Sequence, residues 1–331
     1  MKGVMRDVLI ALVLGTVLPS TVMNVGKVLA EQGKAGDRVA ETEQTVSQEP
    51  ETSAPTQGSE LQMLLQQEDG QAVAMGMDAY LLGAVLAEMP ADFEGEALKA
   101  QAVAARTFAR RAYVTGGKHG DGAVCTNYAC CQAYIAPEDY LQRGGTQEDV
   151  DWVRSCVEAT SDLVLTYEGA LIEATYFSCS GGRTEDAEAV WGTEYPYLQA
   201  VDSPGEENAA HYRDTVWFMP EFFAGLLGLE LTGNPEEWFG ETEYTDGGGV
   251  DTMTIGDTLF RGTELRRLLG LRSTAFRVDA VNGEIRITTQ GFGHRVGMSQ
   301  YGADAMAATG ADYTQILQYY YPGTRLERVE E

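Results

Sequence analysis

Basic residues are scarce in this chain. Its 331 residues include 23 Lys and Arg against 50 Asp and Glu, so the formal net charge is −27. Because phosphate binding needs an excess of Lys and Arg, this balance argues against nucleic acid as a partner. Histidine is rarer still, with 3 residues, and the 5 cysteines leave one thiol unpaired even if disulfides form. No internal repeat stands out.

The long apolar run of this chain lies at its N-terminus. Lys2 and Arg6 precede apolar residues from Val8 to about Val25. That length suits either a secretory signal peptide or a single membrane span. Because no clean cleavage site follows directly, residues 1–30 are predicted to be an uncleaved membrane anchor, with the positive end inside the cell and the rest of the chain outside it.

Large apolar side chains are also few in the segment that follows. Residues 31–72 are rich in Glu, Gln, Thr, Ser and Pro. Such a segment cannot bury enough surface to offset its ordering entropy, so it is predicted to be an acidic flexible linker. Folded structure is expected over residues 73–329, as a single extracytoplasmic domain that is two-lobed or carries an inserted subdomain.

The most informative stretch is the run YLLGAVLAEMPADF, which begins at Tyr80. Its apolar positions recur at helical spacing, and Pro90 disfavours helical geometry at Met89, so a helix is expected to end near Glu88. Apolar neighbours and the negative end of the helix dipole both raise the pKa of a carboxylic acid. Such an acid, protonated near neutral pH, can act as a general acid, although a helix-end Glu can also merely point to water.

A second helix, rich in alanine, is expected over residues 96–113. Lys99, Arg106 and Arg110 fall on one face of it, apart from the stripe of small residues. This face follows Glu88 closely along the chain. It is therefore either a solvated surface or a surface that binds a substrate.

Two hairpins and two further helices are expected later in the chain, which indicates an α+β fold. The hairpins comprise residues 163–167 with 170–177, around Glu168-Gly169, and residues 278–280 with 284–289, around Asn282-Gly283. The helices are expected near residues 297–308 and 312–321.

Five motifs of this chain resemble, in order, those of the stage II sporulation protein D family. They are AEMPADFEGEALKAQAVAARTFA, YFSCSGGRTEDAEAVWG, YLQAVDSP, TELRRLLGLRS and GFGHRVGMSQYGADAMA. The resemblance covers nearly all of residues 73–329. It implies a peptidoglycan lytic transglycosylase that acts during engulfment of the forespore.

The implied reaction cleaves the bond between N-acetylmuramic acid and N-acetylglucosamine without water. The muramyl C6 hydroxyl attacks its own anomeric carbon and leaves a 1,6-anhydro end, on glycan strands whose stem peptides have been removed. The resemblance also implies stage II sporulation proteins P and M as partners, P removing the peptides and M acting as a membrane scaffold. The implied location is the mother-cell engulfing membrane, with the catalytic domain outside the cytoplasm.

By match to these motifs, Glu88 is implied to be the catalytic acid and base. Substrate-binding roles are implied for Lys99, Arg106, Tyr176, Ser180, Gly181, Gly182, His294, Gln300 and Tyr301. Lys99 and Arg106 can hold the lactyl carboxylate of muramic acid, or they can pair with nearby acids.

Three acids in the matching motifs have open roles. Asp186, Glu188 and Asp202 can stabilise the positive charge that develops on the sugar, or they can be loop-capping or surface carboxylates. A nucleophilic role is not expected for Ser180, since no His or other base lies beside it in the sequence.

A zinc site is predicted at His119, Cys125 and Cys131, which follow one another at intervals of six residues, with Cys130 as a further candidate ligand. Thiolates with an imidazole suit tetrahedral zinc, although this spacing is looser than that of a CxxC knuckle. Some family members bind structural zinc through a similar set, with a His expected in place of Cys130. The alternative is a disulfide from Cys125 to Cys130 or Cys131. Zinc is favoured here, as a structural ion that the chemistry of Glu88 does not need.

Two non-catalytic functions compete with the enzyme. Relatives with this domain are amidase enhancers, so the protein could bind glycan and stimulate a partner amidase, or it could be a membrane-tethered scaffold. Neither function needs an acid at an apolar helix end, so Glu88 favours the enzyme.

Overall fold

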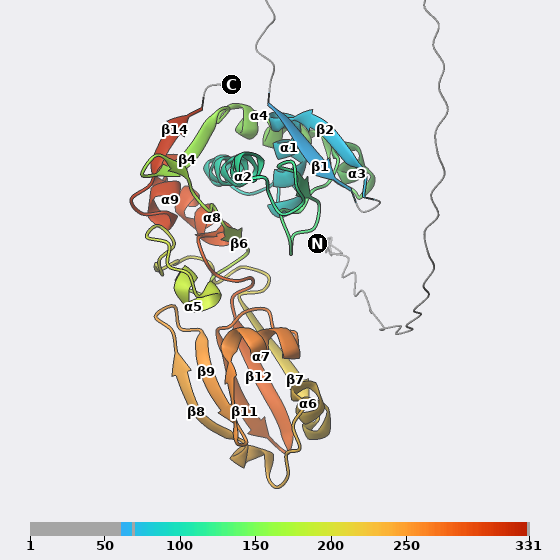
Figure 1. Cartoon of the computed structure of the whole chain (residues 1–331), viewed down its shortest axis with the longest axis vertical. Coiled ribbons are helices and arrows are strands. Elements are labelled where there is room, and N and C mark those ends of the chain that lie inside the picture. The colour runs from blue at the N-terminus through green and yellow to red at the C-terminus, as the bar shows by residue number, and fades with distance from the viewer. Residues whose placement is uncertain (1–60, 68–69, 330–331) are drawn as a thin grey trace, which may run out of the picture. The chain divides into compact units, whose positions relative to one another are not determined.

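The computed structural model of the protein describes residues 61–67 and 70–329, which lie within one compact unit of the chain. The predicted membrane anchor, residues 1–30, and residues 31–60 of the predicted linker lie outside the described residues. Within the described part, no helix is long and apolar enough to cross a membrane. Helices and strands are mixed, which confirms the α+β class (Figure 1).

Regular structure begins earlier than predicted, inside the segment expected to be linker. Strand β1, Gln62–Gln66, pairs antiparallel with β2, Ala72–Gly76, and parallel with β3, Val124–Cys125. Met63 and Leu65 alternate along β1 and are 0% and 1% exposed. These two side chains lie on one face of the strand and are buried, although the polar composition of the whole segment predicts a linker without buried residues.

The first two helices lie where the sequence predicts them. Helix α1, Met77–Glu88, ends at an extended Met89 with φ −126°, as the position of Pro90 requires. Helix α2, Gly95–Thr115, ends at Gly116, whose φ of 86° is the left-handed conformation that glycine adopts most easily. A loop of a few residues therefore joins Glu88 to the start of α2.

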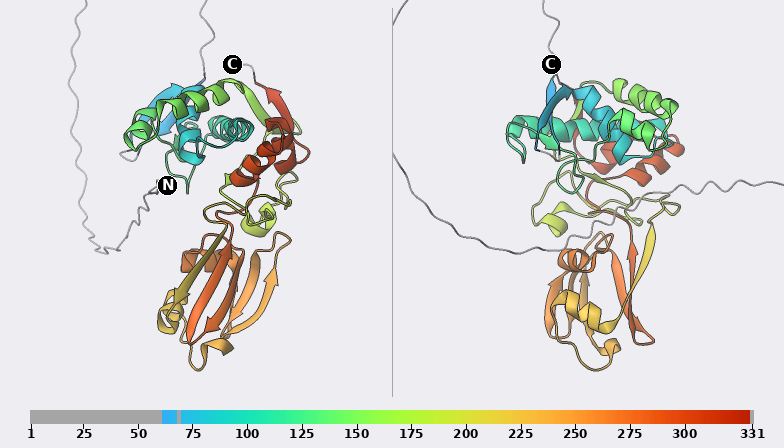
Figure 2. Two further views of the ribbon diagram at one scale, coloured as in Figure 1. Left: turned by 180° about the vertical axis from the view of Figure 1, so that it is seen from behind. Right: turned by 90° about the vertical axis from the view of Figure 1, so that its right-hand side faces the viewer.

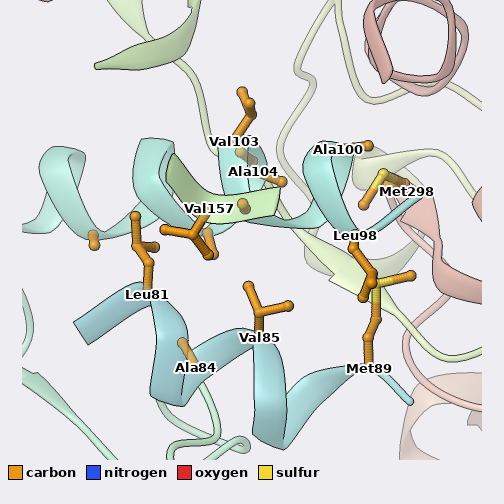
Figure 3. Close-up of a cluster of buried hydrophobic side chains, with 14 of the residues drawn as sticks. Leu81, Ala84, Val85, Met89, Leu98, Ala100, Val103, Ala104, Val157 and Met298 are labelled. Carbon is orange, nitrogen blue, oxygen red and sulfur yellow. The ribbon is translucent and has the colours of Figure 1, made fainter. Parts of the chain in front are cut away.

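The contact between α1 and α2 is the centre of a hydrophobic core. Figure 3 shows buried side chains of this core from both helices and the residue after α1, together with Val157 and Met298 from distant parts of the chain: Leu81, Ala84, Val85, Met89, Leu98, Ala100, Val103 and Ala104. Full burial of a Leu or Val side chain contributes about 1.5–3 kcal/mol. This contact therefore holds the end of α1, and Glu88 with it, in a fixed position.

Further elements cover α2 on its other sides. These elements include α4, Gln147–Glu158; α8, Gln300–Ala308; α9, Tyr313–Tyr320; and β4, Leu163–Tyr167. Strand β4 pairs antiparallel with β14, Arg325–Arg328, and with β5, Ala170–Leu171. Helix α3, Pro137–Gln142, packs against α1. Helices α8 and α9 confirm the two predicted near the C-terminus.

The first predicted hairpin has the expected turn but not the expected second strand. Glu168 and Gly169 have φ values of 51° and 81°, and they join β4 to β5. Strand β5 then stops at Leu171, because Ile172 enters the core at 1% exposure. Residues Tyr176–Phe177 form a separate strand, β6, which pairs parallel with β13, Met298–Ser299.

Buried residues between 223 and 287 form a second hydrophobic cluster, separate from the first. It lies among two three-stranded sheets, β11–β12–β7 and β10–β9–β8 (Figure 2). The strands are β7, Arg213–Phe218; β8, Phe239–Tyr244; β9, Val250–Ile255; β10, Thr258–Arg261; β11, Phe276–Val281; and β12, Glu284–Gln290. The helices are α6, Pro220–Leu227; the 3-10 helix η1, Pro235–Glu237; and α7, Gly262–Leu269.

The second predicted hairpin is confirmed within this cluster. Strands β11 and β12 pair antiparallel, and the turn between them contains Asn282 and Gly283 with φ values of 53° and 85°. These are the positive φ angles that an Asn-Gly turn of this kind requires. Helix α6 packs on β12, and α7 packs on β9 (Figure 2).

Candidate active site around Glu88

Glu88 is the last residue of α1, and its side chain is partly buried. The backbone N–H of Ala133 donates to Glu88 Oε1 at 2.6 Å. The side chains of Tyr176 and Gln300 also form hydrogen bonds with this carboxyl group. Burial raises the pKa of Glu88, and the three hydrogen bonds oppose that rise without cancelling it. The carboxyl group therefore has the raised pKa that the sequence predicts.

A chain of hydrogen bonds orients the Tyr176 hydroxyl toward Glu88. The Tyr80 hydroxyl donates to Gln132 Oε1 at 2.6 Å, and Gln132 Nε2 donates to the Tyr176 hydroxyl oxygen at 2.7 Å. Because that oxygen already accepts from Gln132, its own proton is directed to Glu88. Burial raises the pKa of both tyrosines well above the ordinary value, so both hydroxyls remain protonated donors.

The pairing of β6 with β13 explains how distant residues meet at Glu88. Met298 lies opposite Tyr176 in this parallel ladder, and Ser299 lies opposite Phe177. Ser299 then caps helix α8, its hydroxyl accepting from Gly302 N at 3.2 Å, so Gln300 starts that helix beside Tyr176. Of the predicted site residues, the structure thus brings together Glu88, Tyr176 and Gln300.

His294 forms hydrogen bonds with backbone groups of two residues, Val296 and Tyr176. Its Nδ1 accepts from Val296 N at 3.1 Å, and the ring also forms a hydrogen bond with the backbone of Tyr176. Burial, together with the nearby charge of Arg266, lowers the pKa of His294 to about 4, so the imidazole is neutral. These bonds tie the imidazole to the backbone around Tyr176, and the sugar contact predicted for His294 stays a prediction.

The loop that contains Ser180, Gly181 and Gly182 also differs from the prediction. Glu206 accepts hydrogen bonds from the Ser180 N–H at 2.7 Å, the Ser180 hydroxyl at 2.8 Å and the Gly181 N–H at 3.0 Å. The Gly182 N–H donates to the Ser180 hydroxyl at 2.9 Å. These amides are thus used within the protein and not offered to a sugar. Gly181 has φ +80°, and a Cβ there would lie 2.8 Å from the backbone nitrogen of Gly291, which explains why glycine is needed.

Arg106 does not face the solvent as predicted. It is 2% exposed, and its guanidinium donates to Thr160 O at 2.7 Å and to Asp78 Oδ1 at 3.1 Å. Other elements cover helix α2 on this side, so Lys99 and Arg106 do not form one exposed surface although they lie on one face of the helix. Lys99 pairs with Glu96 at 2.6 Å, which corresponds to the alternative of a salt bridge.

The remaining predicted residues have contacts with groups other than Glu88. Tyr301 packs edge-on against Phe93 of the loop after α1, with ring centroids 5.0 Å apart. Asp186 accepts from Ala200 N at 2.9 Å, and Asp202 pairs with Arg183 at 2.7 Å. Glu188 is on helix α5, Ala187–Trp191, and lines an open pocket with Asp186.

The four predicted zinc ligands lie together. Their ligand atoms are all within 4.8 Å of one another, and they include Cys130: the set is His119, Cys125, Cys130 and Cys131. His119 Nε2 lies 3.4 Å from Cys130 Sγ, and the Cys130 and Cys131 sulfurs are 4.0 Å apart. Sulfurs bound tetrahedrally to zinc at about 2.3 Å are about 3.8 Å from each other, so these distances fit the ion. The structure has free thiols at all five cysteines, which disfavours the disulfide alternative.

Sequence reasoning missed Tyr80, Gln132 and Ala133 as members of the site. Tyr80 has a signal, since its spacing from Glu88 places both on the same side of α1. The residue types of Gln132 and Ala133 give no signal of a site. They are connected with a predicted feature only because they directly follow Cys131 in the sequence.

Comparison with known proteins identifies relatives of this chain. A family model described as stage II sporulation protein matches residues 66–167, which include α1 and α2. Stage II sporulation protein D of Bacillus amyloliquefaciens is 38% identical over 259 residues, which cover 77% of this chain and 75% of the relative. The stage II sporulation protein D of Bacillus subtilis has the same identity and coverage.

A second kind of relative is the amidase enhancer of Bacillus subtilis, which is 30% identical over 306 residues. These cover 74% of this chain but 40% of the enhancer. The two D proteins, in contrast, are each matched over 75% of their length. The chain therefore belongs to the stage II sporulation protein D family.

Proposed function

We propose that this protein is a peptidoglycan lytic transglycosylase that cleaves peptide-stripped glycan strands during forespore engulfment. The observation that carries the proposal is the Glu88 carboxyl group, whose pKa is raised by burial while three hydrogen bonds remain available to its charged form. An acid that must both give and accept a proton needs such an environment. Family membership supports the same function.

The proposed reaction uses Glu88 in two steps. The protonated carboxyl group first donates its proton to the glycosidic oxygen, and the bond from that oxygen to the muramyl C1 breaks. The resulting carboxylate, held by Ala133 N–H, Tyr176 and Gln300, then takes the proton of the muramyl C6 hydroxyl as that oxygen bonds to C1. The products are a 1,6-anhydromuramyl end and a free N-acetylglucosamine hydroxyl. Glu88 is protonated again, and no water is consumed.

The surroundings of Glu88 favour this reaction over hydrolysis. Hydrolytic glycosidases usually use two carboxyl groups at a defined separation. Among the described residues, the groups that bond the Glu88 carboxyl are an amide N–H, a phenol and a carboxamide, and none is an acid. A single acid that is regenerated in each cycle is sufficient for the non-hydrolytic route.

A structural zinc ion is proposed at His119, Cys125, Cys130 and Cys131. Four protein ligands complete a tetrahedral site, so no position is left open for a substrate. Cys131 directly precedes Gln132 and Ala133, which bond Tyr176 and Glu88. The ligand set would therefore fix the segment that orients the acid.

The cellular setting is proposed from the sequence and the family. Residues 1–30 would anchor the protein in the engulfing membrane of the mother cell, and residues 31–60 would tether the catalytic domain outside the cytoplasm. The second hydrophobic cluster would be a subdomain inserted in that domain. Stage II sporulation proteins P and M are the proposed partners, and P would supply the peptide-free strands.

A non-catalytic function is the second candidate, since the amidase enhancer of Bacillus subtilis is a relative. Incubation with peptide-free glycan strands, followed by mass spectrometry of the products, distinguishes the candidates. Anhydromuramyl ends support the proposed reaction, whereas new reducing ends indicate hydrolysis. Unchanged strands that remain bound to the protein support the binding function.

A further inference from the structure

Arg266, on helix α7, is a partly buried cation without a partner. Within residues 61–67 and 70–329, its guanidinium has no hydrogen bond or ion pair, and burial lowers its pKa. Arg272 of the same sequence run, in contrast, pairs with Asp214 at 2.6 Å. A partly buried arginine normally has an acidic or carbonyl partner, because desolvation of an unpaired charge is unfavourable. Arg266 is therefore well suited to an anion that comes from outside the chain.

The segment that follows helix α7 contacts the loop that contains His294. The Gly293 N–H donates to Arg272 O at 3.0 Å, and the Arg272 guanidinium lies 5.0 Å from the centroid of the Phe292 ring. In keeping with this contact, the charge of Arg266 lowers the pKa of His294, which in turn forms a hydrogen bond with the backbone of Tyr176. The hydroxyl of Tyr176 bonds Glu88. One residue, Tyr176, thus connects the surroundings of Arg266 with the acid.

An exposed indole also contacts His294. Trp191, at the end of α5, is 42% exposed, and its ring centroid lies 5.3 Å from that of His294. His294 also contacts Phe177, with centroids 5.7 Å apart, so the imidazole connects the indole with the core. The exposed part of the Trp191 ring offers a rigid apolar surface.

We propose that Arg266 and Trp191 form a subsite for one N-acetylmuramic acid residue of the glycan strand. The guanidinium binds the lactyl carboxylate through charge-assisted hydrogen bonds, which are stronger in a partly desolvated place. The indole packs against the apolar face of the sugar ring. This inference rests on the proposed glycan substrate. It also replaces Arg106, which is buried and engaged, as the cation for that carboxylate.

The subsite explains how the strand is placed relative to Glu88. Muramic acid and glucosamine alternate along the strand, so a subsite that accepts only the acidic sugar fixes the register of all the others. Glu88 then meets the same kind of glycosidic bond each time. A local cation near the site also attracts an anionic strand to a chain whose net charge is −27.

The test measures binding to a Glu88→Gln protein, in which the strand is not consumed. Two ligands of equal length are compared by calorimetry: a peptide-free glucosamine–muramic acid oligomer, and the same oligomer with its carboxylates reduced to alcohols. Arg266→Gln should weaken binding of the acidic oligomer at least tenfold, about 1.4 kcal/mol, and leave the reduced oligomer unchanged. Arg266→Lys should restore part of the loss.

Two further variants complete the test. Arg267→Gln, at the exposed neighbouring position of α7, should change neither ligand, and Trp191→Leu should weaken both to the same extent. The Tm of Arg266→Gln should be equal to or above that of the parent, since an unpaired buried charge is removed. If Arg266→Gln alters both ligands equally or neither, the subsite is refuted while the proposed function stands. If neither oligomer binds and the wild-type protein cleaves no glycan, the proposed function fails, and the subsite fails with it.

Discussion

Replacing Arg106 by methionine should destabilise the protein without a specific effect on glycan binding. The guanidinium donates to Thr160 O at 2.7 Å and to Asp78 at 3.1 Å, and a hydrogen bond with a charged group contributes about 1.5–3 kcal/mol. The guanidinium also donates to Val157 O at 3.3 Å. Neither carbonyl is left unpaired in the variant, because Thr160 O also accepts from Leu163 N–H and Val157 O also accepts from Thr160 N–H. The expected loss is about 2–4 kcal/mol of unfolding free energy.

Thermal unfolding measures this loss directly. At about 2–4 °C per kcal/mol for a domain of this size, the Tm of Arg106→Met should fall by about 4–16 °C. Lys99→Met is the matched control on the same helix, because it removes only a half-exposed pair with Glu96 and should cost about 0.2–1 kcal/mol. An unchanged Tm together with weaker glycan binding would show that Arg106 contacts substrate, and would refute its structural role.

Three further predictions follow from the site. Tyr176→Phe removes a hydrogen bond that lowers the pKa of Glu88, so the loss of kcat/KM on the alkaline side should move to higher pH; a shift to lower pH contradicts this. Cys125→Ser removes one proposed zinc ligand, so elemental analysis should find less than the one zinc ion per chain expected for the wild type, and activity should fall as well. Full zinc content in the variant refutes the ligand set. Glu206→Gln replaces an accepting carboxylate oxygen with an amide NH2 that cannot accept from the backbone N–H groups facing it, so the free energy of unfolding measured with denaturant should fall by about 2–4 kcal/mol. Glu207→Gln, at the exposed neighbouring position, should change it little. Equal losses in the two variants contradict the network.

Local signals in the sequence were sufficient to predict the elements that hold the acid. Apolar spacing and Pro90 determine where α1 ends, and the Asn282-Gly283 turn determines the second hairpin. The His and Cys positions, six residues apart, were sufficient to predict a cluster that the chain does bring together. In each case the physical cause lies within a few residues of the feature.

Features that depend on what covers a surface could not be predicted in this way. Periodicity places Lys99 and Arg106 on one face of α2, but the elements packed on that face come from elsewhere in the chain, and they bury Arg106. Tyr176 and Gln300 meet only because β6 leaves its expected hairpin and pairs with β13. Gln132 belongs to the site through tertiary contacts alone, and its residue type gives no sign of them.

The measurement that tests the central claim most directly is the yield of anhydromuramyl ends from peptide-free strands, compared between the wild type and Glu88→Gln. That substitution keeps the shape and most hydrogen bonds of the side chain but removes its titratable proton. Asp92→Asn, at the exposed acid in the loop after α1, is the matched control and should keep wild-type yield. The account predicts that Glu88→Gln yields no anhydromuramyl ends above background although the strand still binds. Near wild-type yield from Glu88→Gln, or reducing ends from the wild type, would contradict it.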